Sequence, residues 1–126
     1  MARIIVIDDE AGFREFVRVT LEEQGHQVEE AKDGFEALAI CEREPVDLAL
    51  VDLIMPRKDG VKTIEELRAA HEQTSIIVVT GAAPGRWPLR MLYDRPGAVH
   101  MLVKPVTAEM LVDTVSEALA ERATSA

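Results

Sequence analysis

The sequence contains a single cysteine, Cys41, and no apolar run long enough to cross a membrane. One cysteine cannot form an internal disulfide, so a reduced thiol on a buried or half-buried helix position is expected. A membrane span would need about 18 consecutive apolar residues, and no charged-then-apolar leader opens the chain. These absences argue against a disulfide-stapled or membrane protein and favour a reducing, cytoplasmic location.

Positive charge is also scarce. The chain has 14 lysines and arginines against 23 aspartates and glutamates, which gives a formal net charge of −9. Direct binding to nucleic acid needs a basic face, so this balance argues against it, although a DNA-binding partner domain on a longer chain stays compatible with it. The three histidines show no metal-ligand spacing.

What the sequence does contain is a regular alternation of strand and helix patterns. With 126 residues, one domain is expected over residues 1–122, followed by a frayed tail over 123–126. Apolar runs predict four strands, over residues 3–8, 46–51, 75–79 and 99–103. Residues 26–31 are more polar and can form a short second strand. Because strands alternate with helices, the predicted fold class is α/β, a parallel sheet with helices on both faces.

The segments between these strands carry apolar residues at helical spacing. Gly25 stands where the first helix should stop. Asp33 is a candidate N-cap for the second helix, and Thr107 for the last one. The stretch 82–96 contains three prolines, which predicts a short, shifted or partly unwound fourth helix near residues 87–94.

Polar residues stand at the ends of four predicted strands. The first strand ends at Asp8 and Asp9, the third at Asp52, the fourth at Thr80 and the fifth at Lys104. Because parallel strands point the same way, these side chains should meet at one edge of the sheet, where open parallel sheets bind ligands. Asp52 is expected to cap its strand rather than to be buried within it.

Three carboxylates at one edge need a positive partner. Two carboxylates about 4 Å apart repel by about 4 kcal/mol at an effective dielectric of about 20, so one must be neutralised or a cation must bind. Oxygen ligands favour a hard ion such as Mg²⁺. Thr80 and Lys104 add a hydroxyl and an ammonium, which suit a phosphoryl group. The predicted site therefore has Asp52 as a nucleophile that becomes phosphorylated.

Four motifs in this order resemble bacterial response-regulator receiver domains of the chemotaxis-regulator type. They are IVIDDE (residues 5–10), LVDLIMPRKDG (50–60), VVTGA (78–82) and LVKP (102–105). Each motif closes a predicted strand, and the resemblance covers essentially the whole chain. It implies a flavodoxin-like, doubly wound sheet in the order 2-1-3-4-5. It also implies a cis peptide between Lys104 and Pro105.

The resemblance assigns a role to each residue at the predicted edge. Asp52 would be the phosphoacceptor. Mg²⁺ would be bound directly by Asp9 and Asp52, through water by Asp8, and by the backbone carbonyl of Ile54. Lys104 would pair with the phosphoryl oxygens.

The resemblance also implies a switch, and here the chain departs from the family. Thr80 would hydrogen-bond the phosphoryl group and reorient when it arrives. Three residues before Lys104 the family usually has an aromatic residue that turns inward as the threonine moves, but this chain has Met101. Together with the proline-rich stretch 82–96, this departure puts the usual output surface in doubt.

The function that follows is a phosphoacceptor switch in two-component signal transduction. It is not an enzyme, because it supplies chemistry only for its own phosphorylation and dephosphorylation. The implied donor is a sensor histidine kinase or a histidine phosphotransfer protein; the output domain or partner is unknown, and homodimerisation is left open.

Two other functions are weighed against this one. The first is a degenerate receiver that acts as a phosphorylation-independent interaction module, which the intact set of site residues argues against. The second is a phosphatase of the haloacid-dehalogenase type. That family places a second aspartate two positions after the nucleophile, where this chain has Ile54.

Overall fold

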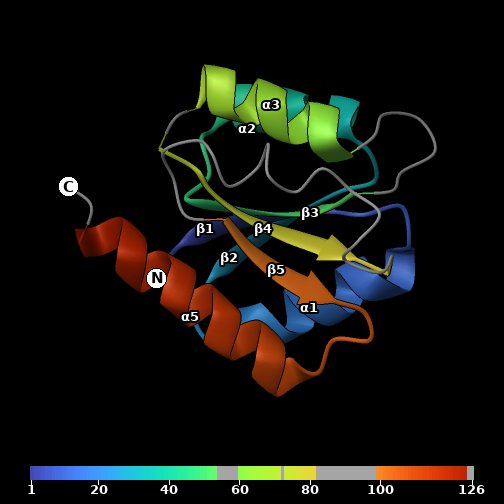
Figure 1. Cartoon of the computed structure of the whole chain (residues 1–126), viewed down its shortest axis with the longest axis vertical. Helices are drawn as coiled ribbons and strands as arrows, with labels where there is room; N and C mark the ends of the chain where they lie inside the picture. Colours follow the sequence, from blue (N-terminus) through green and yellow to red (C-terminus); the bar gives the residue numbers. More distant parts are fainter. Residues whose placement is uncertain (54–59, 72, 82–98, 125–126) are drawn as a thin grey trace.

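The computed structural model describes residues 1–53, 60–71, 73–81 and 99–124. In these residues, a five-stranded sheet lies between two layers of helices (Figure 1). Helices α2 and α3 cover one face, and α1 and α5 cover the other. The strands are β1 (Arg3–Ile7), β2 (Gln27–Ala31), β3 (Leu48–Asp52), β4 (Ser75–Thr80) and β5 (Val99–Val103); the helices are α1 (Ala11–Glu23), α2 (Gly34–Arg43), α3 (Gly60–Ala70) and α5 (Ala108–Thr124).

All neighbouring strands are parallel, and their order is β2-β1-β3-β4-β5. The α/β class, the doubly wound arrangement and the predicted strand order are therefore confirmed. The irregular helix predicted near residues 87–94 lies outside the described residues, as does Ile54.

The sheet has a separate hydrophobic cluster on each face. Side chains alternate between the two faces along each strand, so Ile5 and Ile7 lie in the cluster beneath α2 and α3, whereas Ile4 and Val6 lie in the cluster beneath α1 and α5. All four are buried. Burial on both faces explains why β1, β3 and β4 were visible in the sequence as apolar runs.

Both predicted helix caps are confirmed. The Asp33 side chain accepts a hydrogen bond from the Glu36 backbone N–H at 2.9 Å, and Thr107 Oγ1 accepts one from the Met110 N–H at 3.1 Å. Each such cap is worth about 1 kcal/mol. Gly25 follows α1 with a φ of 90°, a left-handed conformation that favours glycine.

Asp52 corrects one of the predictions. It was expected to lie outside its strand, but it is the last residue of β3 and is only 6% exposed. The reason lies in its neighbour β4, which continues to Thr80, so that the ladder pairs Asp52 with Val79. The carboxylate is therefore attached to a strand that is hydrogen-bonded and buried up to its end.

Three smaller features complete the fold. Helix α5 runs to Thr124, so it includes two residues of the tail that was expected to fray. The Lys104–Pro105 peptide is cis. Cys41 is buried, and burial raises the pKa of its thiol.

None of the helices described is both long and apolar enough for a membrane span.

Candidate functional site

Backbone hydrogen bonds join β1 to β2 and β5 to β4 at their carboxyl ends. They fix the residues that follow β1 and β5. The Asp8 N–H, just after β1, donates to the Ala31 carbonyl at 3.1 Å. The Lys104 N–H, just after β5, donates to the carbonyl of Thr80, the last residue of β4, at 2.9 Å. The side chains of these residues therefore start from backbone positions that the sheet itself determines.

Three carboxylates gather at this edge. Asp8, Asp9 and Asp52 each offer an oxygen, and the three oxygens lie within 4.8 Å of one another. Asp8 is 1% exposed and Asp52 6%, whereas Asp9 is exposed. In the described part of the chain, no histidine or cysteine joins this cluster. An oxygen-only donor set with one face open to water fits a hard divalent cation such as Mg²⁺.

Lys104 supplies positive charge to the cluster. Its Nζ lies 2.9 Å from Asp8 Oδ2, 3.1 Å from Glu10 Oε1 and 3.9 Å from Asp52 Oδ2. Burial alone would lower the pKa of Lys104, but hydrogen bonds to Asp8 and Glu10 and the charges of Asp8 and Asp52 outweigh it and raise the pKa. The ammonium is thus shared among several carboxylates and is closer to Asp8 than to Asp52.

Thr80 and Met101, the predicted switch pair, lie on neighbouring strands. Thr80 ends β4 and is 1% exposed. Met101 is half-buried, pairs with Val78 and packs against the cluster beneath α2 and α3. The predicted ligand carbonyl of Ile54 belongs to the residues that are not described.

Two further residues contact the site and were not singled out from the sequence. Glu10 binds Lys104, and its own N–H donates to Asp8 Oδ1 at 2.9 Å. The ring of Phe13 lies beneath the same ammonium, with its centroid 4.5 Å from Lys104 Nζ. Glu10 stands in the IVIDDE motif, but nothing in the sequence separates its role from that of a helix N-cap, and Phe13 fits the apolar pattern of α1.

Gly60 sets how closely α3 approaches the end of β3. Its N–H donates to the Leu53 carbonyl at 3.0 Å. A Cβ at this position would overlap the backbone of Asp52 and Leu53. Glycine is therefore required here because the start of α3 meets the backbone of Asp52 and Leu53 directly.

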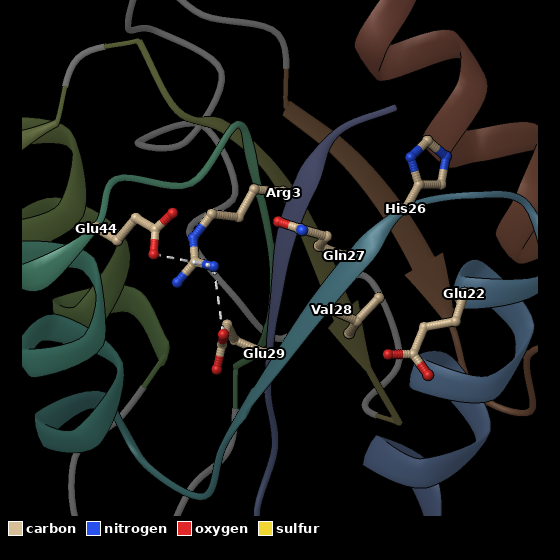
Figure 2. A pocket seen from close by; sticks show the side chains of 7 residues that line it. All are labelled: Arg3, Glu22, His26, Gln27, Val28, Glu29 and Glu44. Carbon is tan, nitrogen blue, oxygen red and sulfur yellow. Dashed lines mark ion pairs between the residues drawn. The ribbon is translucent and has the colours of Figure 1, made fainter.

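A pocket of about 500 Å³ lies at the opposite, amino-terminal end of β1 and β2. Figure 2 shows that Arg3, Glu29 and Glu44 lie on one side of β2, with Glu22 and Val28 on the other. The charged groups there pair with each other: Arg3 Nη1 is 3.3 Å from Glu29 and 3.4 Å from Glu44. None of the predicted site residues lines this pocket.

Comparison with known proteins points to one family. The model of the response regulator receiver domain matches residues 4–116. The protein PilH of Pseudomonas aeruginosa is 32% identical over 120 residues, which cover 95% of this chain and 99% of PilH. Several other curated relatives are longer proteins, and the chain spans 17% to 47% of their length.

Solved structures agree with this match. A CheY-like receiver domain protein from Methanospirillum hungatei has a TM-score of 0.89 and 29% identity, with 100% of this chain and 99% of that chain covered. The response regulator TrrA of Thermotoga maritima, solved in complex with Mg²⁺-BeF, has a TM-score of 0.80 and 29% identity, with 93% and 98% covered.

Proposed function

Because the chain belongs to the response-regulator receiver domain family of two-component systems, we propose that it is a switch operated by phosphorylation of Asp52. The observation that carries the proposal is the meeting of Asp8, Asp9 and Asp52 within 4.8 Å, with the Lys104 ammonium 3.9 Å from Asp52. The receiver unit is proposed to span residues 1–122, with 123–126 as a tail beyond it.

In the proposed reaction, a carboxylate oxygen of Asp52 attacks the phosphorus of a phosphohistidine. A new O–P bond forms, the donor's P–N bond breaks, and the histidine leaves with the electron pair. The product carries more negative charge at an edge that already has three carboxylates. The Lys104 ammonium offsets part of it by moving from Asp8 toward the phosphoryl oxygens.

Mg²⁺, which the family typically uses, fits the donor set and would neutralise charge on the nucleophile and the incoming group. Asp9 and Asp52 would hold it directly, Asp8 would act through water, and the carbonyl of Ile54 would complete the protein ligands. The relative TrrA was solved with Mg²⁺-BeF, which supports the same choice of ion.

The signal is proposed to pass through Thr80 and Met101. The Thr80 hydroxyl would turn toward the phosphoryl group, and Met101 on the neighbouring strand β5 would repack in response. Methionine is flexible and can fill either position, so the switch would work without the aromatic residue usual in the family.

The proposed phosphodonor is a sensor histidine kinase or a histidine phosphotransfer protein, in the cytoplasm. The output is an unknown domain or partner protein, without direct nucleic-acid or membrane binding by this domain. The phosphorylation and dephosphorylation of its own Asp52 would be the only chemistry that the domain supplies. A degenerate, phosphorylation-independent module is the alternative; the complete set Asp8, Asp9, Asp52, Thr80 and Lys104 favours the switch.

Intact-protein mass spectrometry tests this proposal. The chain is mixed with Mg²⁺ and acetyl phosphate or phosphoramidate, alongside Asp52→Asn and, as a matched control, the exposed Asp113→Asn in α5. We expect one phosphate adduct on the wild type and on Asp113→Asn and none on Asp52→Asn. Absence of any adduct would instead support the interaction module, and sustained phosphate release from many substrates would support a phosphatase.

A further inference from the structure

The first turn of α1 contacts Lys104 through a residue to which the proposed function gives no role. Phe13 lies in the first turn of α1, and its ring centroid is 4.5 Å from Lys104 Nζ. An ammonium over an aromatic face is attracted by the negative charge of the π-electrons. The Lys104 side chain is 20% exposed, so water competes with this attraction only in part.

The ring differs from the carboxylates that also hold this ammonium. Asp8 and Glu10 bind it at 2.9 and 3.1 Å through directed, charge-assisted hydrogen bonds, which break when the ammonium moves. An aromatic face attracts a cation over a range of about 6 Å and has no single bonding direction. The Phe13 contact can therefore persist while the ammonium moves the short way from Asp8 toward Asp52, 3.9 Å from its present position.

Packing fixes the Phe13 ring in this place. Phe13 is half-buried against the cluster beneath α1 and α5. Its ring is tilted by 44° against that of Phe16, with 6.1 Å between the centroids. A ring held by the core offers the ammonium a fixed surface. A flexible carboxylate such as Glu10, which is 66% exposed, does not.

We propose that Phe13 is a positioning residue for Lys104: its ring keeps the ammonium within reach of Asp52 both before and during phosphoryl transfer. This inference rests on the proposed function of Asp52. Ordinary core packing is the competing explanation. A substitution of Phe16 distinguishes the positioning role from core packing. Phe16 belongs to the same helix and the same cluster as Phe13 but stands one turn further from β1.

The experiment compares Phe13→Leu, which removes the ring, with Phe13→Tyr, which keeps it, and with Phe16→Leu as the matched control. Pentafluorophenylalanine at position 13 keeps the shape of the ring but reverses the sign of the electrostatic potential over its face. Two quantities are measured: the rate of adduct formation with acetyl phosphate and Mg²⁺, and the ring-current shift of the Lys104 methylene protons next to Nζ in the unphosphorylated protein.

Without the ring's attraction, the Lys104 ammonium should spend more time turned away from Asp52. We therefore expect Phe13→Leu and the pentafluoro variant to slow phosphorylation about two- to fivefold, the range that a partly exposed cation–π contact provides. Phe13→Tyr and Phe16→Leu should keep the wild-type rate, and the ring-current shift should disappear in Phe13→Leu alone among the natural variants. A wild-type rate in Phe13→Leu, or an equal loss in Phe16→Leu, would overturn the proposal.

Failure of this inference differs from failure of the proposed function. If the wild type forms no adduct, the Asp52 proposal fails. The ring-current shift of the Lys104 methylene protons then decides whether the ring holds the ammonium: if Phe13→Leu retains this shift, the contact between Phe13 and Lys104 is wrong. If the wild type forms the adduct and the Phe13 variants do so equally fast, only the positioning role is wrong. Should Phe13→Leu unfold, the pentafluoro variant, which preserves the packing volume, decides the question.

Discussion

The two ends of the same sheet treat charge in opposite ways. At the amino-terminal end, Arg3 pairs with Glu29 and Glu44, whose side chains are 43% and 65% exposed. At the carboxyl end, Lys104 pairs with Asp8, whose side chain is 1% exposed, and lies near Asp52, at 8%. Exposed pairs contribute little because water screens them, whereas charges held out of water interact strongly. The comparison indicates that burial of the carboxylates Asp8 and Asp52 distinguishes the proposed reactive edge from the charged surface at the amino-terminal end.

The largest effect is expected where the backbone supports the carboxyl end. Gly60→Ala should destabilise the protein by about 3 kcal/mol or more, because its Cβ would overlap the Asp52 and Leu53 backbone, which cannot yield as a side chain can. Gly12→Ala is the matched control, because a Cβ there meets nothing within 4 Å. The higher helix propensity of alanine should stabilise the protein by about 0.5–1 kcal/mol. Urea unfolding measures both. Equal changes in the unfolding free energy for Gly60→Ala and Gly12→Ala would contradict the close approach of α3 to the end of β3.

Next in size is a pair of substitutions at the carboxyl end with opposite signs. Asp8→Asn removes the charged partner at 2.9 Å from Lys104 and should destabilise by about 1.5–3 kcal/mol. Asp9→Asn removes an exposed carboxylate that is repelled by the other two and should stabilise by less than about 1 kcal/mol. The unfolding free energy is measured in the presence of a chelator, so that no Mg²⁺ is bound. Destabilisation by both substitutions would show that repulsion at this edge is unimportant.

A smaller effect is expected from pH. The pKa of Lys104 is raised in the folded protein, so its contribution to stability is fully present below its unfolded pKa of about 10.4 and is lost as pH rises through the higher folded value. The difference in unfolding free energy between wild type and Lys104→Gln should therefore be constant from pH 7 to 9 and shrink above about pH 10.4. A difference that grows with pH would contradict the pairing.

The smallest effect is expected at the amino-terminal end. Arg3→Met removes the two ion pairs to exposed carboxylates and should change the unfolding free energy by less than about 1 kcal/mol. It should also leave the rate of phosphorylation unchanged. A loss as large as that of Asp8→Asn would mean that burial does not separate the two ends.

Much of the fold and of the candidate site could be predicted from the sequence because strands and helices alternate regularly along the chain. Apolar runs located four of the five strands, and all five predicted ranges agree with the structure to within two residues at each end. Parallel alternation then required that residues at strand ends share one edge, which is why Asp8, Asp52 and Lys104 could be predicted to lie close together. The caps at Asp33 and Thr107 follow from local hydrogen bonding and needed no tertiary information.

Other features depend on tertiary contacts that no local pattern encodes. Asp52 lies inside β3 because β4 extends far enough to pair with it. Phe13 and Glu10 approach Lys104, some ninety positions away in the chain, because of how α1 packs beside β1 and α5. A helical pattern shows which residues are apolar, but it does not show which one meets a distant ammonium.

A crystal structure of this chain grown with Mg²⁺ and beryllofluoride, a mimic of the phosphoryl group, would decide whether Asp52 accepts the phosphoryl group and Lys104 holds it. We predict beryllofluoride on the Asp52 carboxylate, Mg²⁺ beside Asp9 and Asp52, and Lys104 Nζ closer to a fluoride than to Asp8. Beryllofluoride absent from Asp52, or Lys104 still 2.9 Å from Asp8 and out of reach of the bound group, would contradict it.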